Sequence, residues 1–400
     1  MKKIYLDNAA TTPVDKKVLS AMAKCWSSEF GNPSSIHSMG VEAKISLQKS
    51  RKTIAKFIDG HDREMVFTSG GTESNNLAIF GLINALRKEG RKYSDIHIIT
   101  TEIEHSSILE CLKEIELRGG KVDYLKVNEF GIISPKDLRG LVTKDTVLVS
   151  VGYANGEIGV VQPIKEIIKE IRHFRKEFNR ERISFPYLHL DASAGGQYLN
   201  MNVEELGVDL VTIDAQKIYG PKGIGALFVR DGIKIEPIIY GGGQERGIRG
   251  GTENVPLIVG FAEAVLLIEN NKEKENARLV KIRDYFFSEI RKFIPSVIIN
   301  GDLKARLSSN INISIPGQDG EMLVFRLDEA GITCSASSAC SSGLGESVVV
   351  RKLAEKTNLN KEQIEGRARS SLRFSMGKDT KITDIKKLLF ILKKLNKMFS

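Results

Sequence analysis

The chain has 400 residues and carries 59 lysine and arginine residues against 50 aspartate and glutamate residues, a formal net charge of +9 at pH 7. Hydrophobic residues make up 41% and charged residues 27% of the chain, which excludes the composition of a disordered protein. The length predicts two or three domains, one of which can be a large α/β unit. The positive charge permits an anionic partner, and a solvated basic surface is the simpler explanation.

The cysteine content and the N-terminal segment predict a protein of a reducing compartment. Four cysteines are scattered along the chain: Cys25, Cys111, Cys334 and Cys340. Their number and spacing fit neither a disulfide scaffold nor a metal site. No apolar signal segment follows the first residues, and the most apolar stretch, residues 255–268, is interrupted by Pro256 and Glu263. We therefore expect a cytoplasmic protein without a metal site and without a membrane segment.

Short β-branched segments alternate with longer segments of helical periodicity in the first part of the chain. The expected strand and helix pairs are residues 65–68 with 73–88, 96–100 with 106–118, and 146–151 with 164–178. Further strands are expected at residues 187–190, 210–213 and 225–229. This alternation predicts βαβ units that form a large α/β domain with a mainly parallel sheet.

The chain changes character after Gly251. One or two long helices are expected within residues 255–293, and the remaining strands are expected near residues 297–299, 310–315 and 371–374. These elements predict a smaller α+β unit. The last helix, residues 382–398, has leucine and isoleucine on one face and lysines elsewhere, which is typical of an amphipathic helix with a basic outer face.

Two expected strand ends carry residues suited to ligand binding. The segment Thr68-Ser-Gly-Gly-Thr-Glu73 leads from a strand into a helix, where Gly70 and Gly71 let backbone N–H groups approach an anion such as phosphate. A plain helix-entry turn has the same pattern. Asp191 ends an apolar strand, a place where carboxylates of parallel sheets reach the ligand crevice. An N-cap for the next helix is the alternative explanation of Asp191.

A lysine follows another apolar strand. Lys217 precedes a tight turn rich in glycine and proline, so its amine can be partly desolvated and act as a Schiff-base nucleophile, whereas Lys222 lies on the exposed turn. Asp191 and Lys217 lie only 26 residues apart, which allows them to occupy neighbouring strand ends. A lysine and an acid in this arrangement match pyridoxal phosphate.

Two further residues of interest lie in the last quarter of the chain. Cys340 is surrounded by serine, alanine and glycine, which predicts a loop that displays a thiol. Burial is the better explanation of Cys25, Cys111 and Cys334. Arg373 lies in the middle of an expected strand, where a buried guanidinium needs an anion. That anion is either a substrate carboxylate or an internal acid.

These motifs together resemble the cysteine desulfurases of the NifS/IscS type, fold type I pyridoxal-phosphate enzymes of aminotransferase class V. The motifs that carry the resemblance span the chain: Tyr5-Leu-Asp-Asn-Ala-Ala-Thr-Thr-Pro13, Gly31-Asn-Pro-Ser-Ser35, Gly71-Thr-Glu-Ser-Asn-Asn76, Thr101-Glu-Ile-Glu-His105, Lys217-Ile-Tyr-Gly-Pro-Lys-Gly223, Arg249-Gly-Gly-Thr252, Ser338-Ala-Cys340 and Arg373. The resemblance implies a fold type I transferase, with a mainly parallel seven-stranded sheet in a large cofactor-binding domain of residues 15–258. It also implies a small α+β domain, residues 1–14 and 259–400, that carries the cysteine loop.

The resemblance implies an enzyme that converts L-cysteine to L-alanine and holds the sulfur as a persulfide on Cys340. The expected acceptors are an iron–sulfur cluster scaffold or a tRNA-thiolation enzyme, and the expected assembly is a homodimer without direct nucleic-acid binding. Selenocysteine lyase is an alternative of the same chemistry.

The resemblance also implies a role for each matching residue. Lys217 would carry pyridoxal 5'-phosphate, Asp191 would hold its pyridine nitrogen protonated, and His105 would stack on the ring and assist proton transfers. The phosphate would be held by Gly71, Thr72 and Gln216, and by Thr252 of the partner subunit. Asn155 and Arg373 would bind the substrate carboxylate, and Cys340 would attack the substrate sulfur.

Four positions depart from the family pattern: Gly156, Ala194, Asp214 and Gln216. At the first two, an amide that donates to the ring oxygen of the cofactor is lost. At the last two, a carboxylate and an amide replace two donors to the phosphate. We expect weaker or differently arranged cofactor binding in an active enzyme. A non-catalytic relative with an altered pocket is the alternative.

Overall fold

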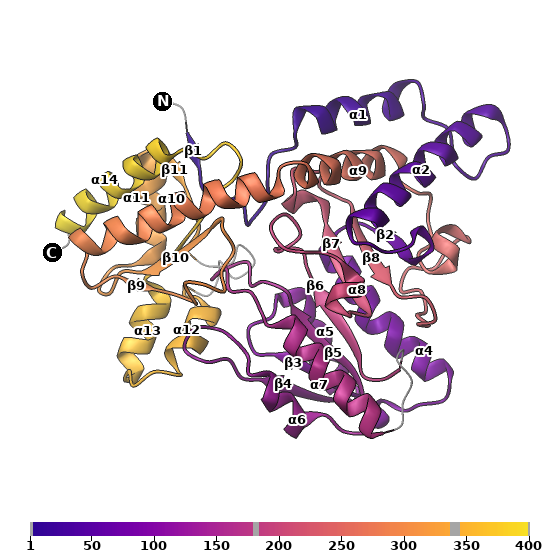
Figure 1. Cartoon of the computed structure of the whole chain (residues 1–400), viewed down its shortest axis with the longest axis horizontal. Coiled ribbons are helices and arrows are strands. Elements are labelled where there is room, and N and C mark those ends of the chain that lie inside the picture. The colour runs from indigo at the N-terminus through magenta and orange to yellow at the C-terminus, as the bar shows by residue number, and fades with distance from the viewer. Residues whose placement is uncertain (1–2, 179–183, 337–344, 399–400) are drawn as a thin grey trace.

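The larger unit of the molecule is built on one seven-stranded sheet. The computed structural model describes residues 3–178, 184–336 and 345–398 (Figure 1). The strands run in the spatial order β2-β8-β7-β6-β5-β3-β4. Their bounds are β2 Met65–Thr68, β3 His97–Thr101, β4 Lys121–Leu125, β5 Thr146–Gly152, β6 Tyr187–Asp191, β7 Leu210–Asp214 and β8 Gly225–Val229. Only β8 runs against its neighbours, which confirms the prediction of a mainly parallel sheet.

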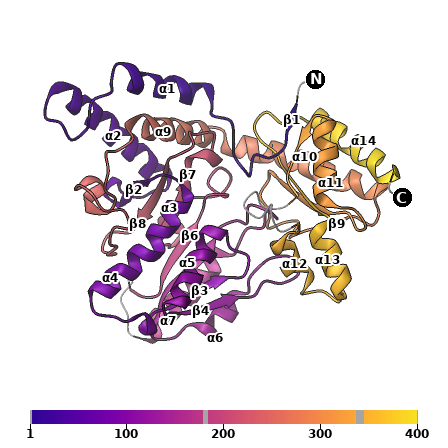
Figure 2. The same cartoon turned by 180° about the vertical axis from the view of Figure 1, so that it is seen from behind.

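Helices cover both faces of this sheet. The views in Figures 1 and 2 show α7 on one face and α4 and α5 on the other, with α1 and α2 packed against α9 at one edge. The helices of the larger unit are α1 Lys16–Ser27, α2 Ser38–Phe57, α3 Gly71–Asn76, α4 Leu82–Lys88, α5 Ser106–Leu117, α6 Leu138–Leu141, α7 Ile164–Glu177, α8 Val203–Leu206 and α9 Val255–Glu269. A π-helical turn, Leu77–Gly81, joins α3 to α4, so the predicted helix of residues 73–88 is continuous.

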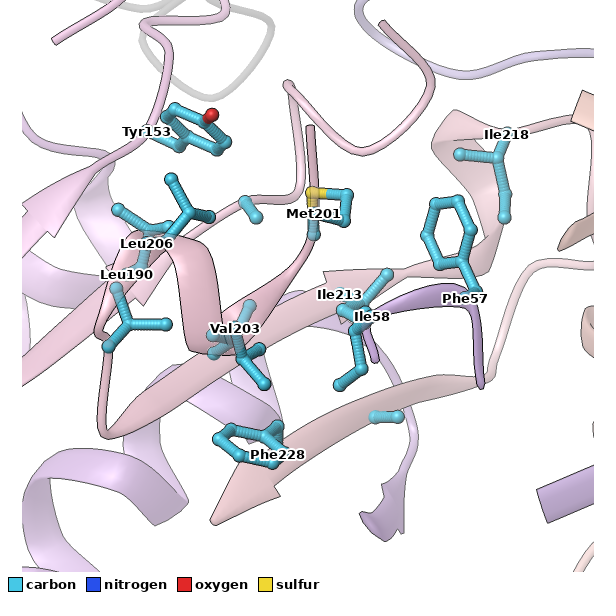
Figure 3. Packing of buried hydrophobic residues seen from close by; sticks show 14 of the residues in the cluster. Phe57, Ile58, Tyr153, Leu190, Met201, Val203, Leu206, Ile213, Ile218 and Phe228 are labelled. Carbon is cyan, nitrogen blue, oxygen red and sulfur yellow. The ribbon is translucent and has the colours of Figure 1, made fainter. Parts of the chain in front are cut away.

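The strands alternate their side chains between two hydrophobic cores. Ile98 of β3 and Leu210 of β7 belong to the core beneath α4 and α5, whereas Ile99 and Val211 belong to the core on the opposite face. Figure 3 shows part of that second core. Apolar side chains on successive residues of these strands are required because both faces of the sheet are buried.

The smaller unit combines an antiparallel sheet with five helices among the described residues. The sheet has the order β12-β10-β9, and a separate parallel pair joins β1 to β11. The strand bounds are β1 Ile4–Tyr5, β9 Ile298–Ile299, β10 Asn310–Ser314, β11 Ile332–Thr333 and β12 Ser371–Ser375. The helices are α10 Lys272–Phe293, α11 Gly320–Glu329, α12 Val348–Ala354, α13 Lys361–Arg369 and α14 Ile382–Met398. The first strand of the chain, β1, thus belongs to the smaller unit that the last part of the chain forms (Figure 1). The exact limits of the two domains stay a prediction.

The strand list from the sequence lacked β4. Its sequence, Lys-Val-Asp-Tyr-Leu, alternates exposed and partly buried residues, and only Leu125 is buried, because β4 is an edge strand paired with β3 alone. The two long helices after residue 254 are α9 and α10. Over the part of the chain that the structure describes, none of the helices has both the length and the apolar character needed to span a lipid bilayer.

Candidate functional site

A cavity of about 340 Å³ lies between the carboxyl ends of the central strands, the N-terminal segment and the smaller unit. Eight of the residues predicted for the site line this cavity: Gly71, Thr72, His105, Asn155, Asp191, Gln216, Lys217 and Arg373. They come from segments more than 300 residues apart. The fold therefore brings most of the predicted site together in the crevice at the carboxyl ends of the strands, where α/β proteins bind ligands.

Asp191 is the last residue of β6 and is 9% exposed. Its Oδ2 accepts a hydrogen bond from Asn75 Nδ2 at 2.8 Å, and its Oδ1 accepts from the backbone N–H of Ser193 at 2.9 Å. Asp191 therefore lies in the cavity, as predicted, whereas the N-cap of the next helix, α8, is Asn202.

A chain of hydrogen bonds connects Asp191 to His105. Asn75 Nδ2 also donates to Ser107 Oγ at 2.8 Å, and Ser107 Oγ lies 2.8 Å from His105 Nδ1. His105 is the N-cap of α5, because its Nδ1 accepts the backbone N–H of Ser107 at 3.1 Å. A neutral His105 with an accepting Nδ1 carries its proton on Nε2.

Lys217 follows β7 in a short 3₁₀ turn, Ala215–Lys217. Its Nζ donates to the carbonyl oxygens of Ala9 at 2.5 Å and Ala10 at 2.7 Å. The N-terminal segment thus holds the lysine amine in the cavity, and Lys217 is half-buried as expected, whereas Lys222 is exposed. Because β6 pairs with β7, the predicted closeness of the segments that carry Asp191 and Lys217 is confirmed.

The other end of the cavity contains the backbone of Gly71 and the side chain of Asp214. Asp214 Oδ2 accepts from the Gly71 N–H at 3.3 Å and from Gln216 Nε2 at 3.1 Å, while Oδ1 accepts from the Gln216 backbone N–H at 3.1 Å. A Cβ atom on Gly71 would lie 2.9 Å from Ser193 Oγ and 3.3 Å from Asp214 Oδ2. Glycine is therefore needed for this close approach.

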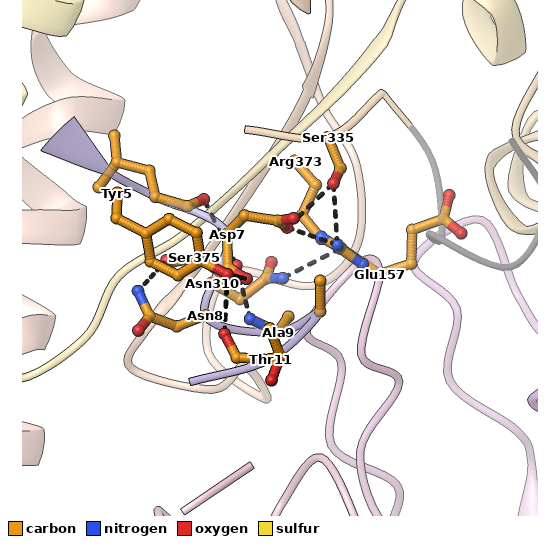
Figure 4. Close-up of polar contacts among 12 residues, drawn as sticks. Tyr5, Asp7, Asn8, Ala9, Thr11, Glu157, Asn310, Ser335, Arg373 and Ser375 are labelled. Atoms are coloured by element: carbon orange, nitrogen blue, oxygen red, sulfur yellow. Dashed lines mark hydrogen bonds and ion pairs between the residues drawn. The ribbon is translucent and has the colours of Figure 1, made fainter. Parts of the chain in front are cut away.

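Arg373 lies on β12 and is 3% exposed. Its Nη2 donates to Asp7 Oδ1 at 2.7 Å and lies 3.2 Å from Ser335 Oγ, which in turn donates to Asp7 Oδ1 at 2.9 Å (Figure 4). The internal acid expected as one of two alternatives is thus Asp7, and Arg373 still lines the cavity.

Asn155 is largely engaged by its own loop. Its Oδ1 accepts from the backbone N–H groups of Glu157 at 2.9 Å and Ile158 at 3.0 Å, and its Nδ2 donates to the carbonyl of Ile103 at 2.9 Å. One amide hydrogen of Nδ2 remains for a ligand. Asn155 can therefore donate to a carboxylate without breaking the loop.

Two buried titratable groups flank Asp191. Burial raises the pKa of Glu104, which lines the cavity, to about 7 despite hydrogen bonds from Thr101 and the Gly152 N–H. Burial lowers the pKa of His189 to about 4, so this histidine is neutral between Ser150 and Thr212. Near pH 7 His189 is therefore uncharged, and Glu104 is partly protonated.

The structure describes three of the four cysteines. Cys25, Cys111 and Cys334 are buried and have no disulfide, as expected. Burial raises the pKa of Cys111 and of Cys334 to about 12 and also raises that of Cys25. Such thiols are poor nucleophiles. Cys340 lies outside the described residues.

Thr252 does not line the main cavity. It is exposed and lines a second cavity of about 160 Å³, beside Arg249 and Glu245. Its predicted contribution to the site of another subunit stays a prediction.

Sequence reasoning missed Asn75, Glu104 and Asp7 as site residues. Asn75 lies four residues after Gly71, so a helical wheel places both on one face. Glu104 directly precedes His105 in the same motif. Asp7 had no local signal, because its partner Arg373 is far away in the sequence.

The chain is similar to known proteins over nearly its whole length. The family model of aminotransferase class-V matches residues 4–388. The cysteine desulfurase IscS of Dictyoglomus turgidum is 41% identical over 98% of this chain and 94% of its own length. A solved NifS-like protein superposes with a TM-score of 0.87 at 31% identity, covering 99% of this chain and 100% of its own.

A second solved structure, SspA in complex with cysteine, has a TM-score of 0.77 at 32% identity and covers 93% of this chain and 98% of its own. The chain therefore belongs to the class-V aminotransferase family and, within it, to the cysteine desulfurases.

Proposed function

We propose that the protein uses pyridoxal 5'-phosphate to convert L-cysteine to L-alanine and holds the sulfur as a persulfide on Cys340. One observation carries this proposal. Asp191 ends β6, Lys217 follows the neighbouring strand β7, and both residues line one cavity. A lysine that forms a Schiff base and an acid that pairs with the pyridine nitrogen are what this cofactor requires. The relatives named cysteine desulfurase and the SspA complex support L-cysteine as the substrate.

The residues around the cavity fit the cofactor. Two buried polar atoms, Ser193 Oγ and Asn75 Oδ1, have no hydrogen-bond partner among the described residues. The carboxylate of Asp191 is 9% exposed and lines the cavity, where it can accept a hydrogen bond from the ring nitrogen. Gly71 leaves space where a side chain would collide with Ser193. When bound, pyridoxal phosphate supplies an electron-withdrawing ring that weakens the bonds of the substrate next to its amino group.

Each cavity residue then has a task. Lys217 would hold the cofactor through its amine, Asp191 would keep the ring nitrogen protonated, and His105 would stack on the ring and assist proton transfers. The phosphate would be held by Gly71, Thr72 and Gln216, together with Thr252 of the partner subunit.

The substrate carboxylate is bound by Arg373, whose guanidinium is fixed by Asp7, and by the remaining amide hydrogen of Asn155. The thiolate of Cys340 forms an S–S bond with the substrate sulfur, the carbon–sulfur bond breaks, and a proton added at that carbon gives alanine. The raised thiol pKa values of the three buried cysteines support Cys340 as the nucleophile.

A homodimer is part of the proposal. Large apolar side chains lie exposed on α1, on the segment before α2 and near residue 240, with Trp26 at 60%, Ile36 at 98% and Tyr240 at 79% exposure. Burial of exposed apolar side chains such as these is a common driving force of protein association. Burial of these side chains between two subunits would stabilise a dimer.

The persulfide sulfur passes to an acceptor protein, an iron–sulfur scaffold or a tRNA-thiolation enzyme. The lysines of α14 offer a basic surface to an acidic acceptor. No direct contact with nucleic acid is expected, and a cytoplasmic location stays a prediction.

Labelling with L-[³⁵S]cysteine tests the proposal. The protein with bound cofactor should take up label that a thiol reductant removes and that maps to Cys340. Cys340→Ala should bind the cofactor normally and take up no label. Label on a different cysteine, or full labelling of Cys340→Ala, would refute the assignment. Parallel assays with L-selenocysteine as the substrate test the alternative that the protein is a selenocysteine lyase.

A further inference from the structure

The acid at the end of β7 occupies an unusual position. Asp214 is 6% exposed, and its carboxylate accepts hydrogen bonds from Gly71 N–H, Gln216 N–H and Gln216 Nε2. All three donors belong to Gly71 and Gln216, two residues that the proposed function assigns to the cofactor phosphate. Asp214 therefore uses the donors that a phosphate group at this place would need.

An ionised carboxylate cannot donate a hydrogen bond to a phosphate and repels its charge. Within the described part of the chain, all the hydrogen-bond donors to Asp214 are neutral N–H groups. The basic residue Arg249 is already paired with Glu73, at 2.9 Å between Arg249 Nε and Glu73 Oε1. The hydrogen-bond donors to Asp214 therefore bring no positive charge to its carboxylate, and Arg249 already has an acidic partner.

We propose that Asp214 is an internal competitor of the cofactor phosphate and lowers the selectivity of the pocket for phosphorylated over unphosphorylated pyridoxal. The proposal rests on the proposed function. Binding of the phosphate would require the carboxylate to leave Gly71 N–H and Gln216 Nε2. Pyridoxal, which lacks the phosphate, meets no such competition, so Asp214 penalises only the phosphorylated form.

Two substitutions separate charge from shape. Asp214→Asn keeps the size of the side chain and an oxygen that accepts from Gly71 N–H. It replaces the other carboxylate oxygen, and with it the negative charge, by an amide group that donates. Asp214→Ser opens the space and supplies a hydroxyl donor. Asp145→Asn is the matched control, because it removes one negative charge from an exposed residue of the same sheet unit.

The experiment is an absorbance titration of the full-length protein with pyridoxal 5'-phosphate and, separately, with pyridoxal. Both Asp214 variants should bind pyridoxal 5'-phosphate with a Kd lower by roughly tenfold or more, because a like charge within a few ångströms is removed. Their Kd for pyridoxal should stay within about twofold of the wild-type value, and Asp145→Asn should change neither.

Competition by inorganic phosphate gives a second readout. Millimolar phosphate should weaken pyridoxal 5'-phosphate binding more in Asp214→Asn than in the wild type, because the donors of the pocket can then donate to a free phosphate ion. Equal affinities of wild type and both variants for pyridoxal 5'-phosphate would overturn the proposal. If Asp214→Ser does not fold, Asp214→Asn alone decides. Failure of every protein, wild type included, to bind either aldehyde at Lys217 would instead overturn the proposed function.

Discussion

Arg373 Nη2 donates to Asp7 Oδ1 at 2.7 Å and so ties the guanidinium of β12 to the segment that follows β1 (Figure 4). Arg373 is 3% exposed, and its Nε has no partner among the described residues. Asp7 therefore neutralises and orients the cation that is proposed to bind the substrate carboxylate.

Replacing Asp7 tests this positioning role. Asp7→Ala should raise KM for L-cysteine about tenfold with a small change in kcat, because a charge-assisted hydrogen bond worth about 1.5–3 kcal/mol no longer fixes Arg373. Asp7→Asn keeps the accepting oxygen and should recover most of the loss. Steady-state kinetics provide both constants. Asp328→Ala, which removes an exposed ion pair with Lys3, serves as control. A loss in kcat alone would contradict the positioning role.

Lys217 should be the single point of attachment of the cofactor. Reduction of the protein with bound cofactor by borohydride should add the cofactor mass to the peptide that contains Lys217, as read by mass spectrometry. Lys217→Ala should lose the yellow colour and the adduct, whereas Lys222→Ala should keep both, because Lys222 is exposed. An adduct on Lys222 in the wild-type protein would show that the wrong lysine was assigned.

Glu104 should make stability depend on pH. Its pKa is raised by burial to about 7, so the folded protein holds a proton that the unfolded chain releases above its ordinary pKa. The free energy of unfolding should therefore fall as the pH rises from about 4.5 to about 7, by roughly 2 kcal/mol after allowance for the open cavity. Above pH 7 the loss is complete.

Glu104→Gln keeps an acceptor for Thr101 and the Gly152 N–H. This substitution should remove the decrease in the free energy of unfolding that the titration of Glu104 causes. Urea denaturation of both proteins at pH 5 and pH 8 measures the difference. Glu110→Gln, an exposed residue of α5, should follow the wild-type curve. Parallel curves for wild type and Glu104→Gln would disprove the assigned titration.

The buried thiols should react slowly. Alkylation by iodoacetamide at pH 8 should modify Cys340 first, because burial holds the pKa of Cys111 and Cys334 at about 12 and leaves little thiolate. Peptide mapping over time measures the order. Cys334→Ser should keep sulfur transfer, and early alkylation of Cys334 in the folded protein would contradict the proposed division of the cysteines.

The sequence predicted the central strands and the closeness of Asp191 to Lys217 because both depend on local signals, apolar runs and the short spacing between them. It did not predict that Asp7 pairs with Arg373, since that contact joins the two ends of the chain. The side-chain direction of Asp214 was also open, because only the fold places Gly71 N–H beside it. The edge strand β4 escaped notice because one face of its sequence is polar.

The most direct test is product analysis after incubation of the protein with pyridoxal 5'-phosphate, L-cysteine and a thiol reductant. The account predicts alanine and sulfide in equal amounts, with both lost in Lys217→Ala and Cys340→Ala. Formation of pyruvate and ammonia in place of alanine, or no alanine from a protein that has bound the cofactor, would contradict it.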